Sequence, residues 1–176
     1  MRRLLFVLPV LIFGAIAAYF AIGLTKDPRE LPSALIDKPA PDFDLPPLIA
    51  AKPGLAKANL GKEVKLVNFF ASWCVPCKVE HPVWMRFVET HNIPLYGINY
   101  KDAKKDAVAW LGQLGNPYKR IGQDRDGRVG IDWGVYGVPE TYVVDKEGRI
   151  RYRHVGPMGP DVLKETILPL IAELKR

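Results

Sequence analysis

Cysteine and histidine are scarce in this sequence, whose 176 residues include only two cysteines and three histidines. A structural zinc site needs four ligands, and only two cysteines are present. His81 lies one helical turn beyond Cys77, but His91 and His154 are at no recognisable ligand spacing. Covalent attachment of a c-type haem needs Cys-x-x-Cys-His, and here Lys78 follows the second cysteine. The sequence therefore predicts no metal, no haem and no other cofactor.

An excess of charge of one sign is also missing. Arg2 and Arg3 supply two of the six net positive charges and residues 1–24 hold no acids, which leaves the rest of the chain with +4. A surplus this small and scattered does not indicate a surface that binds nucleic acid. Nucleic acid is therefore excluded as a partner.

Charged residues are absent from Leu4 to Leu24, a run of 21 residues. A helix rises about 1.5 Å per residue, so this run spans roughly 30 Å, the thickness of the hydrocarbon core of a bilayer. A cleavable signal peptide has a shorter apolar region, although Ala21-Ile22-Gly23 leaves cleavage open as an alternative. Since Arg2 and Arg3 precede the run, we expect a single-pass anchor in a bacterial inner membrane, with the rest of the chain in the periplasm.

Three parts are expected on this basis. Residues 1–24 form the uncleaved signal anchor, with residues 4–24 as its transmembrane helix. Residues 25–36 are rich in proline, which is typical of a linker, and residues 37–176 form one periplasmic domain.

The domain alternates between short apolar runs and amphipathic stretches. Strands are predicted over residues 64–70, 95–100, 141–144 and 150–155, and helices from the cysteines onward, over 102–114 and over 161–174. In the first helix, the apolar residues at helical spacing are Val79, Val83, Phe87 and Val88. Asp102 is expected as the N-cap of the second helix. Pro169 is expected to interrupt the third helix. The resulting order, β-α-β-α-β-β-α, indicates an α/β fold with a mixed central sheet flanked by helices.

Both cysteines lie in the stretch "ASWCVPCK", where Cys74 and Cys77 are separated by two residues. A structural disulfide is one interpretation, but such a small loop removes little entropy from the unfolded chain. A cysteine at the start of a helix meets the positive end of the helix dipole, which lowers the pKa of a thiol. The placement therefore favours a redox-active disulfide over a structural one.

Two motifs resemble a known family. "WCVPCK", the strand before it and Pro82 five residues after the second cysteine resemble the thioredoxin superfamily. "GVYGVPET" at residues 134–141 and "CKVEHP" at 77–82 are similar to the thiol:disulfide interchange proteins of cytochrome c maturation, the CcmG/DsbE family. The resemblance covers residues 37–176 and the N-terminal anchor, and it implies a thioredoxin-like fold.

The resemblance also implies roles for individual residues. Cys74 would be the exposed thiol that attacks a substrate disulfide, and Cys77 the buried thiol that resolves the mixed disulfide. Pro139 would be a cis-proline beside the disulfide, and the preceding Val138 would offer backbone hydrogen bonds to an extended substrate peptide. The remaining expected substrate-binding residues are Trp73, which would shelve the cysteines, and Gly156, which would let the chain pass close to the site.

The position of the buried acid of thioredoxin, six residues before the first cysteine, is occupied by Asn68. An amide does not accept the proton of the resolving thiol, so another group is needed. Glu80, one helical turn after Cys77, and Glu140, directly after the cis-proline, are the candidates, and replacing either is expected to change exchange rather than folding. The alternative is that both are solvated surface charges.

The resemblance implies a protein-disulfide reductase. Its substrates would be the haem-site cysteines of apocytochrome c or a partner thiol protein of cytochrome c maturation, and a membrane thiol transporter of the DsbD or CcdA type would re-reduce it. Two alternatives stay open: a periplasmic dithiol oxidase that works in the opposite direction, and a non-enzymatic tether or chaperone for apocytochrome.

Overall fold

A computed structural model describes residues 2–24 and 33–176 of the chain. The chain divides into two compact units, Met1–Pro32 and Ser33–Arg176. Helix α1 spans Arg2–Leu24 in the first unit, and residues 25–32 of the predicted linker lie outside the described residues. Within the part of the chain that is described, no helix combines the length and the apolar character needed to cross a membrane.

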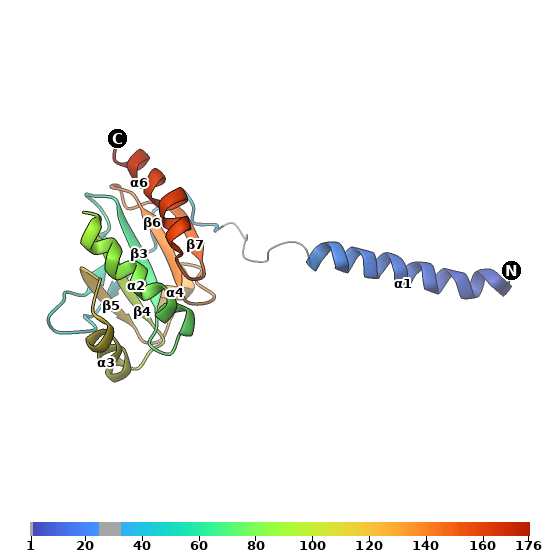
Figure 1. Cartoon of the computed structure of the whole chain (residues 1–176), viewed down its shortest axis with the longest axis horizontal. Helices are drawn as coiled ribbons and strands as arrows, with labels where there is room; N and C mark the ends of the chain where they lie inside the picture. Colours follow the sequence, from blue (N-terminus) through green and yellow to red (C-terminus); the bar gives the residue numbers. More distant parts are fainter. Residues whose placement is uncertain (1, 25–32) are drawn as a thin grey trace. The chain divides into compact units, whose positions relative to one another are not determined.

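A five-stranded mixed sheet with the order β5-β4-β3-β6-β7 forms the centre of the second unit (Figure 1). Its strands are β3 (Lys65–Phe70), β4 (Leu95–Tyr100), β5 (Arg120–Asp124), β6 (Glu140–Val144) and β7 (Ile150–Val155). Strands β3, β4 and β5 pair in parallel, whereas β6 pairs antiparallel with both β3 and β7. The predicted mixed sheet is confirmed.

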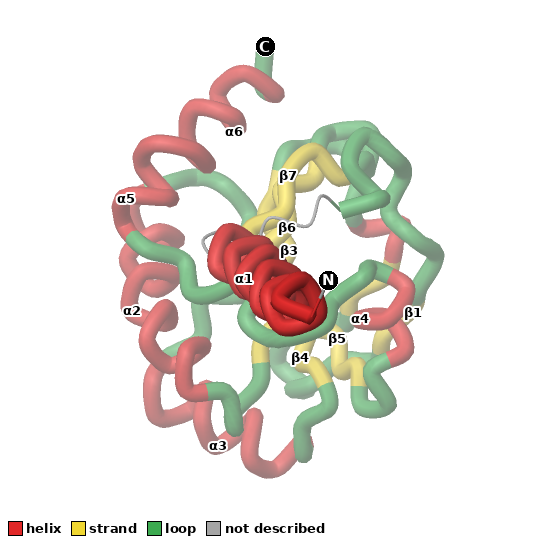
Figure 2. The backbone as a smooth tube through the Cα atoms, turned by 90° about the vertical axis from the view of Figure 1, so that its right-hand side faces the viewer, coloured by secondary structure: helices red, strands yellow, loops and turns green. Residues whose placement is uncertain are grey.

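Helices cover both faces of this sheet. Figure 2 shows α2 (Val75–Thr90), α3 (Lys104–Leu114) and the C-terminal helix on one side, and the short α4 (Arg128–Asp132) on the other. The C-terminal helix consists of α5 (Pro160–Val162), the π-helical η2 (Leu163–Ile167) and α6 (Leu168–Leu174), so Pro169 follows a π-helical stretch and does not end the helix. All six residues of β3 are buried, and its apolar residues divide between two hydrophobic clusters: Leu66 and Phe70 join the cluster on the α2 side, and Val67 and Phe69 the cluster on the α4 side.

A small hairpin extends the edge of the sheet next to β5. It contains β1 (Asp44–Leu45), β2 (Leu55–Ala56) and the 3-10 turn η1 (Lys57–Asn59). A bridge between Pro47 and Gly122 joins it to β5, and Leu45 packs so closely on Gly122 that a Cβ at that glycine would lie 2.6 Å from the Leu45 Cβ. Glycine at 122 thus makes room for the hairpin.

Two elements were missed from the sequence, and two sequence-based predictions are wrong. Strand β5 and helix α4 were not predicted at all. Helix α3 begins at Lys104 with Ala103 as its N-cap, so Asp102 is not the cap. Val79 of α2 is 67% exposed, whereas Phe87 is buried and Val83 and Val88 are partly buried against the core, so Val79 alone departs from the predicted apolar spacing.

Candidate active site

The two cysteines form a disulfide where β3 ends and α2 begins. Cys74 is the N-cap of α2, and its Sγ accepts a hydrogen bond from the backbone N–H of Cys77 at 3.1 Å. Pro76 lies in the first turn, where a missing N–H costs nothing because that donor has no partner within the helix. The cystine therefore sits at the positive end of the helix dipole, as the sequence predicts.

Both sulfur-bearing residues are buried in this oxidised form. Cys74 is 3% exposed and Cys77 is 1% exposed, so the expected exposure of Cys74 is wrong for the disulfide state. The Cys74 Sγ is bonded to the Cys77 Sγ and lies 3.3 Å from the carbonyl oxygen of Val138, and both cysteines belong to the hydrophobic cluster on the α2 side. The neighbouring Trp73 and Val75 are 57% and 68% exposed, so Cys74 borders an apolar surface.

Reduction should make the two thiols unequal. We expect an alkylating agent at neutral pH to label Cys74 first, because the helix N-terminus stabilises its thiolate and it lies beside the exposed Trp73 and Val75. Cys77 follows inside the first turn, where its backbone N–H already binds the Cys74 sulfur. Mass mapping of the reduced, folded protein measures the order, and faster labelling of Cys77 would reverse the expected roles of the two thiols.

The peptide bond between Val138 and Pro139 is cis, which confirms the sequence-based prediction. The Pro139 carbonyl accepts a hydrogen bond from the N–H of Gly156 at 2.9 Å, so the segment after β7 passes beside the proline. Gly156 has a φ of +95°, and a Cβ there would meet nothing within 4 Å. Its backbone conformation, and not a lack of space, explains the glycine.

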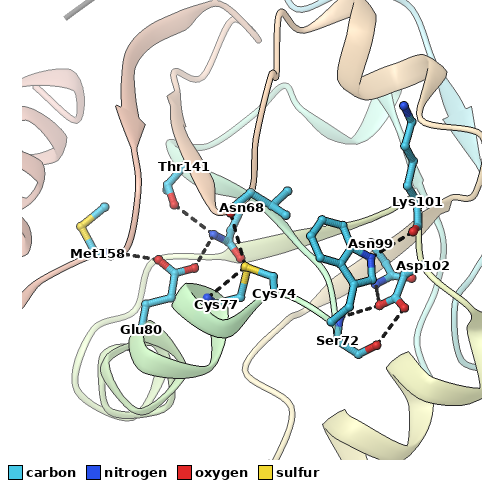
Figure 3. Close-up of a disulfide and its surroundings, with 12 residues drawn as sticks. Asn68, Ser72, Cys74, Cys77, Glu80, Asn99, Lys101, Asp102, Thr141 and Met158 are labelled. Atoms are coloured by element: carbon cyan, nitrogen blue, oxygen red, sulfur yellow. Dashed lines mark hydrogen bonds between the residues drawn. A yellow bond between two sulfur atoms is a disulfide. The ribbon is translucent and has the colours of Figure 1, made fainter. Parts of the chain in front are cut away.

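Glu80 lies on α2, the helix that begins at the cystine, and it is buried and hydrogen-bonded there (Figure 3). Its two carboxylate oxygens accept from the Asn68 side-chain amide at 2.9 Å and from the Met158 backbone N–H at 2.7 Å. Burial raises the pKa of this carboxyl from 4.5 to about 7, and the hydrogen bonds from Met158 and Asn68 offset part of that rise. A carboxyl group with such a pKa exchanges a proton readily at neutral pH.

Asn68 connects Glu80 to the interior of the sheet. Its amide nitrogen also donates to the Thr141 hydroxyl at 3.1 Å, and its carbonyl oxygen accepts from the Tyr118 hydroxyl at 2.7 Å. The amide is thereby oriented with its N–H₂ group toward Glu80. Asn68 thus occupies the place of thioredoxin's acid and presents a donor to a different carboxylate.

Glu140 is fully buried, but its partners differ from those of Glu80. Its carboxylate accepts from Arg153 Nε at 2.8 Å and Arg153 Nη2 at 3.0 Å, from the Tyr142 hydroxyl at 2.9 Å and from the Tyr136 N–H at 3.2 Å. Neither glutamate is a solvated surface charge, which corrects that alternative. Glu140 forms a two-contact ion pair with an arginine of β7, whereas Glu80 forms no ion pair within the described residues.

The role of another buried carboxylate, that of Asp102, was missed by sequence reasoning. Asp102, 5% exposed, accepts from the N–H of Ser72 and the hydroxyl of Ser72 at 2.6 and 2.8 Å, and from the Asn99 amide at 2.9 Å. Its place before a helix had suggested an N-cap, and no local pattern pointed to Ser72, 30 residues earlier. Met158 was missed as well, because it contributes a backbone N–H that any residue could supply.

Metal-binding groups are not apparent around the site. Across residues 2–24 and 33–176, no cluster of three or more histidine, cysteine, aspartate or glutamate side chains is arranged to hold a metal ion. The chemistry that the geometry offers is that of a dithiol, a buried carboxyl group near neutral pKa and a cis-proline.

The chain is similar to known proteins in sequence. Residues 36–167 match the Redoxin family. The thiol:disulfide interchange protein DsbE of Allochromatium vinosum is 46% identical over 165 residues, covering 94% of this chain and 91% of that protein. HelX of Rhodobacter capsulatus, also a thiol:disulfide interchange protein, is 43% identical over 174 residues and 98% of both chains.

Solved structures agree with the sequence relatives. A Chlorobium tepidum protein described as thiol:disulfide interchange protein DsbE superposes with a TM-score of 0.64 at 26% identity, covering 76% of this chain and 95% of that one. The chain therefore belongs to the Redoxin family and, within it, to the thiol:disulfide interchange proteins of the CcmG/DsbE family, and it is a thiol:disulfide oxidoreductase with a thioredoxin-like fold.

Proposed function

We propose that this protein is a membrane-anchored periplasmic reductant of cytochrome c maturation. Its substrates are the oxidised haem-site cysteines of apocytochrome c or a partner thiol protein of that process, and a membrane thiol transporter of the DsbD or CcdA type re-reduces it. The single observation that carries the reducing direction is the buried Glu80 on the helix of the cystine.

The electrostatics of the site support a reductant. An oxidant such as DsbA is strong because its reduced, thiolate form is stabilised. Here a carboxylate at Glu80 disfavours a nearby thiolate, and Val75-Pro76 between the cysteines adds no positive charge. Burial lowers the pKa of His81, one turn after Cys77, which disfavours a positive charge there that would stabilise a thiolate.

The proposed reaction has two exchange steps. The Cys74 thiolate attacks one sulfur of the substrate disulfide, forms a mixed disulfide and releases the other sulfur as a thiolate. Glu80 then accepts the proton of Cys77, whose thiolate attacks the Cys74 sulfur and releases the second substrate thiolate. The substrate gains two electrons, and the protein is left with the Cys74–Cys77 disulfide seen in the structure. Glu140 is a second proposed acid–base group of the site.

Substrate contacts are proposed for the surface around Cys74. The backbone of Val138 forms hydrogen bonds with an extended peptide next to the cis Pro139. Gly156 allows the chain to pass beside that proline, and the side chain of Trp73 lies beside the cysteines and supports them. The exposed indole of Trp73 and the Cys74 Sγ near the Val138 carbonyl support this placement.

The division of the chain is part of the proposal. Residues 1–24 are the anchor, residues 25–36 the linker and residues 37–176 the redox domain on the periplasmic side of the inner membrane. The support comes from the amino-acid sequence, in which the 21 uncharged residues from Leu4 to Leu24 follow two arginines.

The reduction potential tests the direction. Equilibration of the whole protein with a thioredoxin redox pair should give a value near thioredoxin's, about −270 mV, whereas a value near −120 mV would indicate a dithiol oxidase. The reduced protein should also reduce a peptide that carries an oxidised Cys-x-x-Cys-His segment. A Cys74→Ser, Cys77→Ser variant should lose all maturation activity; retention of activity would instead indicate a tether or chaperone.

A further inference from the structure

The strongest unexplained feature is the carboxylate of Asp102, which lies outside the dithiol chemistry. It accepts three hydrogen bonds, and two of them come from Ser72, one from the backbone N–H and one from the hydroxyl (Figure 3). The third comes from the amide of Asn99, the residue next to last in β4. Asp102 therefore ties the turn that ends at Trp73 and Cys74 to the carboxyl end of β4.

The residue before Asp102 is strained. Lys101 has a φ of +44°, a conformation that non-glycine residues adopt rarely and at a cost. Its N–H donates to the carbonyl of Asp124 at 2.9 Å, and its own carbonyl accepts from the indole N–H of Trp73 at 3.0 Å. Such strain persists only where the surroundings fix it, and it concentrates at functional sites. Here the strained residue points a carbonyl at the indole.

Trp73 gains little from packing. It is 57% exposed and lies beside Val75, which is 68% exposed, and Val79 lies one helical turn after Val75 at 67% exposure. A large apolar ring in water has no burial to hold it in one orientation. Its indole N–H donates to the Lys101 carbonyl, and its backbone follows Ser72, whose N–H donates to Asp102.

We propose that Asp102 is a positioning residue that holds Trp73 as a preformed apolar platform beside Cys74, for the peptide segment that flanks a substrate disulfide. The partner it fits is a peptide with an aliphatic or aromatic side chain next to its cysteine. Fixing the ring in advance removes the cost of ordering it when the peptide binds. This inference rests on the proposed reduction of peptide disulfides.

The test compares two substrates with the whole, reduced protein. One is a peptide disulfide with an apolar residue beside a cysteine, and the other is bis(2-hydroxyethyl) disulfide, which is too small to reach the platform. Asp102→Asn, which keeps only one acceptor oxygen, should lower kcat/KM for the peptide roughly two- to ten-fold, mainly through KM, as expected for reordering one large side chain. The rate with the small disulfide should stay unchanged.

Two controls accompany the variant. Asp106→Asn removes a carboxylate from the exposed face of α3 and should leave both rates unchanged. Trp73→Phe removes the indole N–H and should reproduce the loss with the peptide, and combining it with Asp102→Asn should add little, because both changes act on one contact. The indole N–H resonance of Trp73 should shift in the Asp102→Asn protein.

Equal losses on both substrates, full additivity with Trp73→Phe, or no loss with the peptide would each overturn the inference. If Asp102→Asn does not fold, Ser72→Ala carries the test, because it removes one hydrogen bond and keeps the bond to the backbone N–H. It should show a smaller loss with the same substrate dependence. Failure of the wild-type protein to reduce the peptide at all would instead refute the proposed function.

Discussion

Replacing Glu80 by glutamine should slow the attack of Cys77 on the mixed disulfide by roughly ten- to a thousand-fold. The carboxyl group lies one helical turn after Cys77, is 2% exposed, and has its pKa raised by burial to about 7. Asn68, in the place of thioredoxin's acid, donates to this carboxylate and has no base to offer. Glutamine keeps the shape of the side chain but cannot take the proton of the thiol.

The pH dependence of mixed-disulfide resolution should also change in Glu80→Gln. In the wild-type protein the resolution rate should rise as the pH passes through about 7, because Glu80 acts as a base only when deprotonated. In Glu80→Gln that rise should disappear, and the rate should instead follow the ionisation of the thiol itself. The pKa of Cys74 should fall in the variant, because a nearby negative charge that opposes its thiolate has been removed.

The pH dependence of the free energy of unfolding should give independent evidence for the raised pKa of Glu80. The pKa of Glu80 is higher in the folded state than in the unfolded state. The protonated carboxyl group therefore contributes fully to the free energy of unfolding below pH 4.5, and this contribution is lost as the pH rises to about 7. At about 1.4 kcal/mol per pH unit, the wild-type protein should lose about 2 to 3 kcal/mol more between pH 5 and pH 8 than Glu80→Gln does.

The measurements are rapid-mixing kinetics of mixed-disulfide resolution and denaturant unfolding of the oxidised protein, both across pH. Glu89→Gln is the matched control, because this exposed glutamate lies on the same helix. It should match the wild-type protein in both experiments. If Glu80→Gln did too, the buried carboxyl group would have no part in the proton transfer.

The parts of the fold that the sequence predicts well are those whose pattern is local. Strand β3, strand β4 and the hairpin β6–β7 are short apolar runs, and the start of α2 follows directly from the cysteines and Pro76. Strand β5 was missed because its residues, Arg-Ile-Gly-Gln-Asp, include a single large apolar side chain. It is a strand because β4 pairs with it on one side and the β1–β2 hairpin packs over Gly122 on the other.

The candidate site also has parts that the sequence predicts and parts that it does not. The disulfide and the cis-proline depend on motifs that can be read along the chain. The environments of Glu80, Glu140 and Asp102 depend on partners that are remote in sequence, for example Met158, which lies 78 residues after Glu80. The exposure of Val79 could not be predicted from the local pattern either, because an apolar residue at helical spacing can lie on a helix face that no other element covers.

Glu140→Gln should destabilise the protein by about 3 to 5 kcal/mol, because it leaves Arg153 buried without its counter-charge. The arginine side chain is 7% exposed and makes two hydrogen bonds to the carboxylate, which the Tyr142 hydroxyl and the Tyr136 N–H also bind. This differs from the sequence-based expectation of normal folding, because that expectation did not include an arginine 13 residues later.

Denaturant unfolding of Glu140→Gln measures the loss, with Asp42→Asn as the control. Asp42 pairs with Lys57 at 2.8 Å on the surface, its side chain is 92% exposed, and an exposed pair contributes less than about 1 kcal/mol. Replacing Arg153 by glutamine as well should restore part of the stability, since the unpaired buried charge is then gone. A loss no larger than that of Asp42→Asn would show that the Glu140–Arg153 pair does not hold β6 to β7. Slowed resolution in the folded variant is a separate result, and it would support the proposed acid–base role of Glu140.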